Sequence, residues 1–121
     1  GKRAAAMIKE QGEAAFPELR RRDGEFVFAS TYVFVDDMQG VELVNPMFPG
    51  LEGKNILRLN NEEGRQVVKE YIDLVRKKGS GWIGYYWPRP GQTKPSIKHT
   101  YVLSVKHGGK QYVVGCGVYL D

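Results

Sequence analysis

The sequence has very few of the residues that form disulfide frameworks, metal sites and hydrolytic centres. Cys116 is the only cysteine, so an intrachain disulfide and a cysteine-rich metal site are both excluded. It lies in the apolar run VVGCGVY, where a small buried residue is expected rather than a nucleophile. His99 and His107 are the only histidines, and neither has an evident carboxylate partner. We therefore expect no catalytic residues, no metal and no cofactor, and we predict that the protein is not an enzyme.

The sequence also lacks an apolar run of membrane-spanning length, a signal peptide and a nucleic-acid recognition motif. The net charge is +4, but the basic residues are scattered along the chain. The cluster at 76–78 ends a predicted helix, where cations complement the helix dipole. Nucleic acid is therefore not an expected partner. The segment 79–81 (GSG) follows that helix rather than opening one, which excludes a phosphate-binding loop there.

The remaining pattern predicts one α+β domain of 121 residues, in which 41% hydrophobic content is enough for a core. Helical periodicity indicates an N-terminal helix, and Asn60 or Asn61 is expected to cap a second helix before Val67. Runs of strands joined by hairpin-type turns predict an antiparallel five-stranded sheet with the helices covering one face. The predicted ranges are a helix at 2–15, a short second helical turn to Arg22, strands at 25–36, 41–44, 81–87, 98–106 and 111–120, an N-terminal helical segment at 1–24 and a sheet domain at 25–121.

An unusually aromatic strand, GSGWIGYYWPRP at 79–90, is the strongest functional signal in the residues themselves. Strand alternation directs Tyr85 and Trp87 to one face and Trp82 to the other. Lys98 on the next strand adds a cation, and Tyr32 on the first strand adds a phenol. Rings with one lysine suit a small anion that has an apolar tail. An aromatic core with a solvated lysine explains the same pattern, and composition alone leaves both interpretations open.

The loop at 45–53 (NPMFPGLEG) is the predicted cover of this aromatic surface. It carries two prolines and two glycines but also Met47, Phe48 and Leu51, which makes it too apolar for a solvated linker. We therefore expect it to fold back over the sheet.

Several spaced motifs resemble one known family. They are TYVFVDDMQGVELVNP at 31–46, LEGKN at 51–55, GSGWIGYYWPRPG at 79–91, KHTYV at 98–102 and GCGVYLD at 115–121. In this order they resemble the single Cache domain of type 2, a PAS-like extracytoplasmic sensor domain of bacterial chemoreceptors and sensor kinases. The resemblance implies a PAS-like antiparallel sheet preceded by a long N-terminal helix, with a ligand pocket between the sheet and the segment that joins the second and third strands.

The resemblance also implies a small-molecule ligand, such as acetate, propionate, pyruvate, lactate or a similar metabolite, and a set of residues to bind it. Lys98 would pair with the anion, tyrosines would donate hydrogen bonds, and the other members would shape the apolar end. Many family members carry His where this chain has Asn45, and a neutral amide cannot titrate or supply a cation. The expected ligand-binding residues are Tyr32, Phe34, Pro46, Met47, Tyr85, Trp87, Lys98 and Tyr101.

For the whole protein the resemblance implies a periplasmic or otherwise extracytoplasmic location. The domain would be a fragment of a membrane receptor or a secreted sensor, and a homodimer is allowed. The membrane would be contacted only through segments outside this sequence. Ligand would stabilise a closed loop and move the N-terminal helix. The alternative is a structural or dimerisation domain of PAS-like fold that binds no small ligand.

Overall fold

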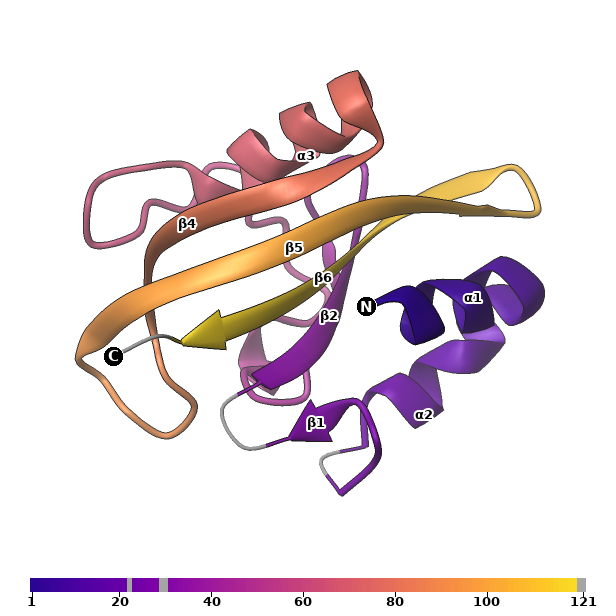
Figure 1. Cartoon of the computed structure of the whole chain (residues 1–121), viewed down its shortest axis with the longest axis horizontal. Coiled ribbons are helices and arrows are strands. Elements are labelled where there is room, and N and C mark those ends of the chain that lie inside the picture. Colours follow the sequence, from indigo (N-terminus) through magenta and orange to yellow (C-terminus); the bar gives the residue numbers. More distant parts are fainter. Residues whose placement is uncertain (22, 29–30, 120–121) are drawn as a thin grey trace.

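The computed structural model describes residues 1–21, 23–28 and 31–119, and its centre is a twisted antiparallel sheet (Figure 1). The order of the strands across the sheet is β1-β2-β6-β5-β4, and β3 also pairs with β2. Gly108 and Gly109 both have positive φ in the tight turn between β5 and β6, as a two-residue hairpin requires. The strands are β1 (Val27–Phe28), β2 (Thr31–Asp37), β3 (Glu42–Val44), β4 (Ser80–Pro88), β5 (Pro95–His107) and β6 (Lys110–Tyr119).

Helices cover both faces of the sheet, so the expectation that they cover one face is wrong. The N-terminal segment packs on one face, and α3 lies on the other (Figure 1). The physical reason lies in β2 and β6, whose apolar runs bury side chains on both faces, as Phe34 and Val35 do. The helical elements are α1 (Lys2–Gln11), η1 (Gly12–Ala15), α2 (Phe16–Leu19), η2 (Pro49–Leu51) and α3 (Val67–Lys78).

All five predicted strands are present, but the first is divided. The predicted strand 25–36 becomes β1 and β2, which pair antiparallel through Val27 and Tyr32. Helix α3 begins at Val67, later than predicted from Asn60 or Asn61 as its cap. Asn61 instead accepts hydrogen bonds from the backbone N–H groups of Glu63 and Arg65 and thereby shapes a loop. The predicted ends at Arg22 and residue 120, and residues 29–30 inside the first predicted strand, lie outside the described residues.

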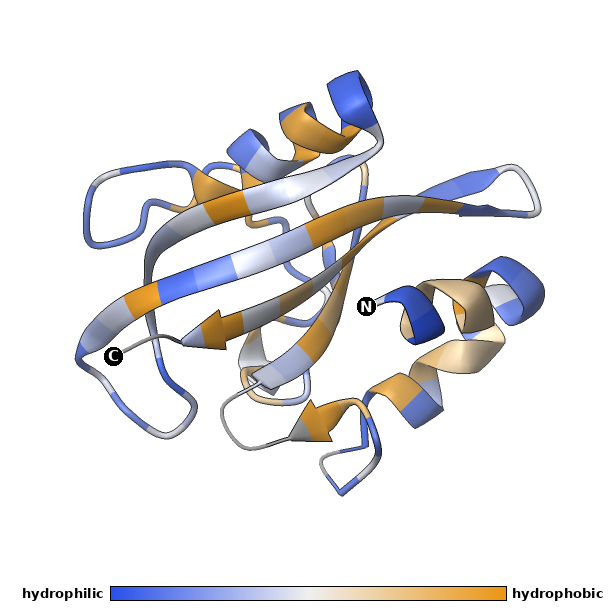
Figure 2. Cartoon of the chain, viewed as in Figure 1, coloured by the Kyte–Doolittle hydropathy of each residue, from blue (hydrophilic) through white to orange (hydrophobic). Residues whose placement is uncertain are grey.

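Two hydrophobic cores result, one on each face of the sheet. The first joins α1 and α2 to side chains such as Val33 and Val114. The second joins α3 to Tyr32, Phe34 and Tyr85. Hydrophobic and hydrophilic residues alternate along α1 and α3, in keeping with one buried and one exposed side on each helix (Figure 2). The candidate site lies within the second core.

Candidate functional site

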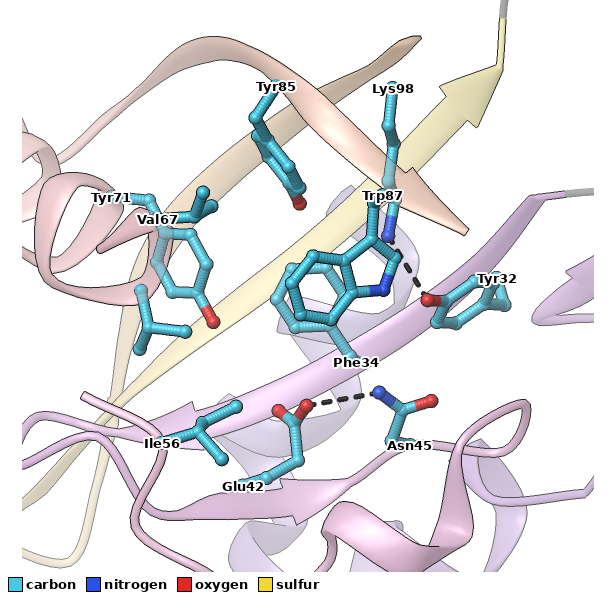
Figure 3. A pocket seen from close by; sticks show the side chains of 11 residues that line it. Tyr32, Phe34, Glu42, Asn45, Ile56, Val67, Tyr71, Tyr85, Trp87 and Lys98 are labelled. Atoms are coloured by element: carbon cyan, nitrogen blue, oxygen red, sulfur yellow. Dashed lines mark hydrogen bonds between the residues drawn. The ribbon is translucent and has the colours of Figure 1, made fainter. Parts of the chain in front are cut away.

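A small cavity lies in the second core, between the sheet, α3 and the residues after β3 (Figure 3). Its volume is about 20 Å³, which is close to the room needed for one water molecule. Most of its wall is apolar or aromatic, and three polar side chains of different chemistry interrupt it. The lining residues are Tyr32, Phe34, Glu42, Asn45, Ile56, Val67, Val68, Tyr71, Tyr85, Trp87 and Lys98.

Lys98 is the cation of this cavity, and only 2% of it is exposed. Its Nζ donates a hydrogen bond to the Tyr32 hydroxyl at 3.1 Å and lies 4.5 Å from the centre of the same ring. Among the described residues no carboxylate forms an ion pair with it. Burial lowers the pKa of Lys98 to about 7, although the nearby Glu42 raises it. Such an amine gains most from an anion placed beside it.

Glu42 is the carboxyl group of the cavity, and sequence reasoning missed it. It is 3% exposed, and its Oε2 accepts a hydrogen bond from Asn45 Nδ2 at 3.0 Å. Its Oε1 is buried without a hydrogen-bond partner among the described residues. Burial raises the pKa of Glu42 to about 8, against the opposing effects of Asn45 and Lys98. The only sequence signal was a charged residue alternating with apolar ones in the strand VELV.

The Asn45 side chain contacts both the covering loop and Glu42. Its Oδ1 accepts hydrogen bonds from the backbone N–H groups of Met47 and Phe48 at 3.2 and 2.9 Å. Because Oδ1 is occupied as an acceptor, Nδ2 must be the group that faces Glu42. Asn45 therefore folds the loop over the cavity and orients the Glu42 carboxyl at the same time.

Aromatic rings complete the wall and connect the loop to the sheet. Trp87 packs edge-to-face against Tyr85, with ring centres 6.0 Å apart, and against Phe48 at 6.4 Å. Phe48 also lies 6.1 Å from the Tyr32 ring, so the loop covers the cavity as predicted. The Tyr85 hydroxyl shares a hydrogen bond with Thr100 Oγ1 at 2.8 Å, which leaves a phenol oxygen inside the core.

Two glycines of β6 make the room that these side chains occupy. A Cβ at Gly115 would overlap the Phe34 ring, and a Cβ at Gly117 would overlap the side chain of Lys98. The register places these glycines opposite Phe34 and Thr100 on the neighbouring strands. The two glycines of the run VVGCGVY therefore allow the side chains of Phe34 and Lys98 to lie directly over β6.

The structure brings together five of the eight residues expected to bind ligand, namely Tyr32, Phe34, Tyr85, Trp87 and Lys98. Pro46 is buried beside Asn45, and Met47 packs against the second core, but neither lines the cavity. The placement expected for Tyr101 is wrong. It is three residues after Lys98 on one strand, so it faces the opposite side of the sheet, where its ring lies 5.3 Å from that of Trp82.

Among the described residues no three His, Cys, Asp or Glu side chains gather as a metal-binding set. In the same part of the chain no helix is both long and apolar enough to cross a membrane.

Comparison with known protein families now defines the class. The Cache domain model dCache_2 matches residues 10–121, and the chain belongs to the Cache domain family. Cache domains are extracytoplasmic sensor domains of chemoreceptors and sensor kinases, with a sensing rather than an enzymatic role. The resemblance of the sequence motifs to a Cache sensor domain is confirmed.

Two curated relatives show the kinds of protein that carry such a domain. The chain is 29% identical over 90 residues to the methyl-accepting chemotaxis protein McpP of Pseudomonas putida. It is 36% identical over 90 residues to the sensor histidine kinase MctS of Rhizobium johnstonii. Each alignment covers 74% of this chain but only 16% and 19% of the two relatives, so the chain spans less than a fifth of their length.

Solved structures give the same answer for the fold. A Cache chemosensory domain described for its carboxylic acid recognition has a TM-score of 0.80 and 30% identity, over 99% of this chain and 83% of that chain. A methyl-accepting chemotaxis protein from Vibrio parahaemolyticus has a TM-score of 0.80 and 26% identity with the same coverage. The predicted α+β sensor fold is confirmed.

Proposed function

We propose that this domain is a periplasmic sensor module that binds a short organic acid, such as acetate, propionate, pyruvate or lactate. The observation that carries the proposal is Lys98, a fully buried amine without a carboxylate partner among the described residues, on the wall of an aromatic cavity. A buried cation is costly unless an anion or hydrogen bonds compensate it. The carboxylic acid recognition described for a structural neighbour supports the same ligand class.

Each end of the cavity suits one part of such a ligand. The carboxylate would accept hydrogen bonds from Lys98 Nζ and from the hydroxyls of Tyr32 and Tyr85. A short alkyl tail would contact Phe34 and Trp87. Met47 and Pro46 would act through the loop rather than by direct contact, since neither lines the cavity.

Binding requires movement, because the cavity holds about 20 Å³ and even acetate is larger than one water molecule. The loop that carries Phe48 is the element to move, since Phe48 contacts the aromatic wall through the rings of Tyr32 and Trp87. Ligand would select the conformation in which this loop closes over the acid, and that population shift would be the signal.

The small cavity also favours a second candidate, a structural domain whose core is filled by its own side chains. The two candidates differ in one property. A sensor gains stability from its ligand through linkage, whereas a structural domain does not respond to any short acid.

A thermal-shift screen separates them. We expect short monocarboxylates to raise the melting temperature, and propionamide, which has the same shape without the charge, to leave it unchanged. Lys98→Met should abolish the rise because it keeps an unbranched side chain of similar size and removes the charge. Lys106→Met is the matched control, since Lys106 is exposed on the same strand. A full response in Lys98→Met would contradict the role of the lysine, and no response in the wild-type domain to any acid would favour the structural candidate.

For the whole protein we propose a chemoreceptor, a sensor kinase or a secreted sensor that uses this domain outside the cytoplasm, as McpP and MctS are a chemotaxis protein and a kinase. The homodimer stays a prediction, and sedimentation of the domain with and without ligand measures it.

A further inference from the structure

Glu42 presents one particular oxygen to the cavity. Figure 3 shows Glu42 rising from β3 and Lys98 descending from β5 toward the same space, with Trp87 between them in this view. Asn45 Nδ2 donates to Oε2 of Glu42, so Oε2 acts as an acceptor. A proton on this carboxyl therefore resides on Oε1, the buried oxygen that lacks a partner among the described residues.

The groups around Glu42 favour a neutral carboxyl. Its cross-strand partner on β2 is Asp36, a second fully buried carboxyl, whose Oδ2 accepts a hydrogen bond from Tyr71 of α3. Two neighbouring carboxylates oppose each other's ionisation. Glu52 of the covering loop adds a third acidic group, held by the backbone N–H of Asn45.

The remaining neighbours supply one cation and two phenols. Among the described residues Lys98 of β5 is the one cation that lines the cavity, and Tyr32 and Tyr85 line it from β2 and β4. Among the described residues no lysine or arginine forms an ion pair with Glu42. The raised pKa of Glu42, about 8, agrees with this geometry, with burial as the main cause.

We propose that Glu42 is a specificity-determining residue that binds the ligand as a neutral carboxylic acid, donating a hydrogen bond from Oε1 to the ligand carboxylate opposite Lys98. The proposal rests on the proposed function and assigns a second binding group to it. An ionised Glu42 would instead repel a carboxylate and accept a hydrogen bond from an ammonium or hydroxyl group. The chemical class selected is therefore a monocarboxylate whose anion lies between an ammonium and a carboxylic acid.

Proton balance follows from this assignment. The bound state holds a charged lysine, a protonated Glu42 and the ligand anion. At about pH 6 the free domain already holds both protons, since the two pKa values are about 7 and about 8, and binding takes up none. At about pH 9 the free domain has lost both, so one proton moves from solvent to Lys98 Nζ and another to Glu42 Oε1 on binding.

The test is calorimetric titration with propionate in buffers of different ionisation enthalpy, on the wild-type domain and Glu42→Gln. Gln keeps an acceptor for Asn45 and an N–H donor toward the cavity, but it cannot take up a proton. We expect both proteins to bind at about pH 6 without proton uptake. At about pH 9 the wild type should take up one proton more than Glu42→Gln on binding. For each unit by which the pH rises, the wild-type affinity for propionate should therefore fall by about ten times the factor by which the affinity of Glu42→Gln falls. Glu62→Gln, at an exposed loop position, is the control and should match the wild type.

The outcomes separate the two proposals. If the wild type fails to bind any short acid at about pH 6, the proposed function fails. If it binds but takes up the same number of protons as Glu42→Gln at about pH 9, Glu42 stays ionised in the complex and the present inference is wrong.

A second measurement needs only the wild-type sequence and does not depend on how the variant folds. In infrared difference spectra at about pH 9, ligand should produce a protonated-carboxyl band that shifts when glutamate is labelled with ¹³C. A band that does not shift with that label, or no band, would overturn the assignment.

Discussion

Lys98 and Glu42 are two buried ionisable side chains that line one cavity without an ion pair between them among the described residues. Burial disfavours both charged forms, so it lowers the pKa of Lys98 to about 7 and raises the pKa of Glu42 to about 8. The charge state of the cavity therefore changes within the physiological range of pH. An anion bound in the cavity would favour the protonated forms of both Lys98 and Glu42.

Stability should report the buried carboxyl directly. Between pH 4.5 and about 8 the folded domain keeps a proton on Glu42 that the unfolded chain releases, so wild-type stability falls as pH rises in this window. Glu42→Gln lacks this term. We expect its free energy of unfolding, relative to wild type, to increase by up to about 1.4 kcal/mol per pH unit across the window, measured by urea unfolding. In the wild type, Lys98 acts in the opposite sense between about pH 7 and 10.5, because burial lowers its pKa.

Glu62→Gln is the control for this series, because Glu62 is an exposed loop residue that does not line the cavity. A constant difference between Glu42→Gln and wild type would mean that Glu42 is ionised in the folded domain throughout the window.

Single residues were predictable from the sequence only where a pattern marked them. Tyr85, Trp87 and Lys98 were found because aromatic density and a cation on neighbouring strands are local signals. Glu42 was missed because a glutamate in a short strand is ordinarily solvated, and only the fold buries it against Asn45. Tyr101 was misplaced although strand parity alone assigns it to the face away from Lys98.

Strand β6 provides the space that the Lys98 side chain occupies. Gly117 has an ordinary backbone conformation, so its requirement is spatial rather than conformational. A Cβ there would meet Lys98 Cε and would lie 2.9 Å from Thr100 Oγ1. The glycines in this strand therefore belong to the architecture of the site.

Gly117→Ala should displace Lys98 and weaken ligand binding. We expect a loss of about 1–3 kcal/mol in unfolding free energy, typical of overpacking, together with a marked reduction of the ligand-induced rise in melting temperature. Gly50→Ala is the control for the loss of unfolding free energy, because a Cβ at Gly50 meets no atom within 4 Å. A Gly117→Ala domain with wild-type affinity for its ligand would show that the position of Lys98 is not set by this strand.

At the level of elements, the sequence predicted the type and order of the helices and strands better than it predicted their boundaries or which faces of the sheet are covered. The five strands and two helical regions were found because hairpin turns and apolar periods are local. The two-sided burial of β2 was missed, although its pattern of five consecutive buried residues requires cover on both faces. The start of α3 was misplaced because Asn61 caps a loop turn rather than the helix.

The whole molecule is a sheet covered on both faces, and the two faces differ in what they bury. The face under α1 and α2 carries an apolar core, whereas the face under α3 carries the cavity and its buried charges. The same strands contribute side chains to both cores, as β2 does with Val35 on one face and Phe34 on the other. The cavity and the N-terminal helices therefore lie on opposite faces of shared strands.

A high-resolution crystal structure of the domain grown with propionate at about pH 6 tests the proposed ligand site most directly. We expect one propionate in the cavity, with a carboxylate oxygen within hydrogen-bond distance of Lys98 Nζ and the loop around Phe48 displaced to enlarge a space that is now about 20 Å³. A domain that retains the small cavity under these conditions, with Lys98 still bonded only to Tyr32, would contradict the proposed site.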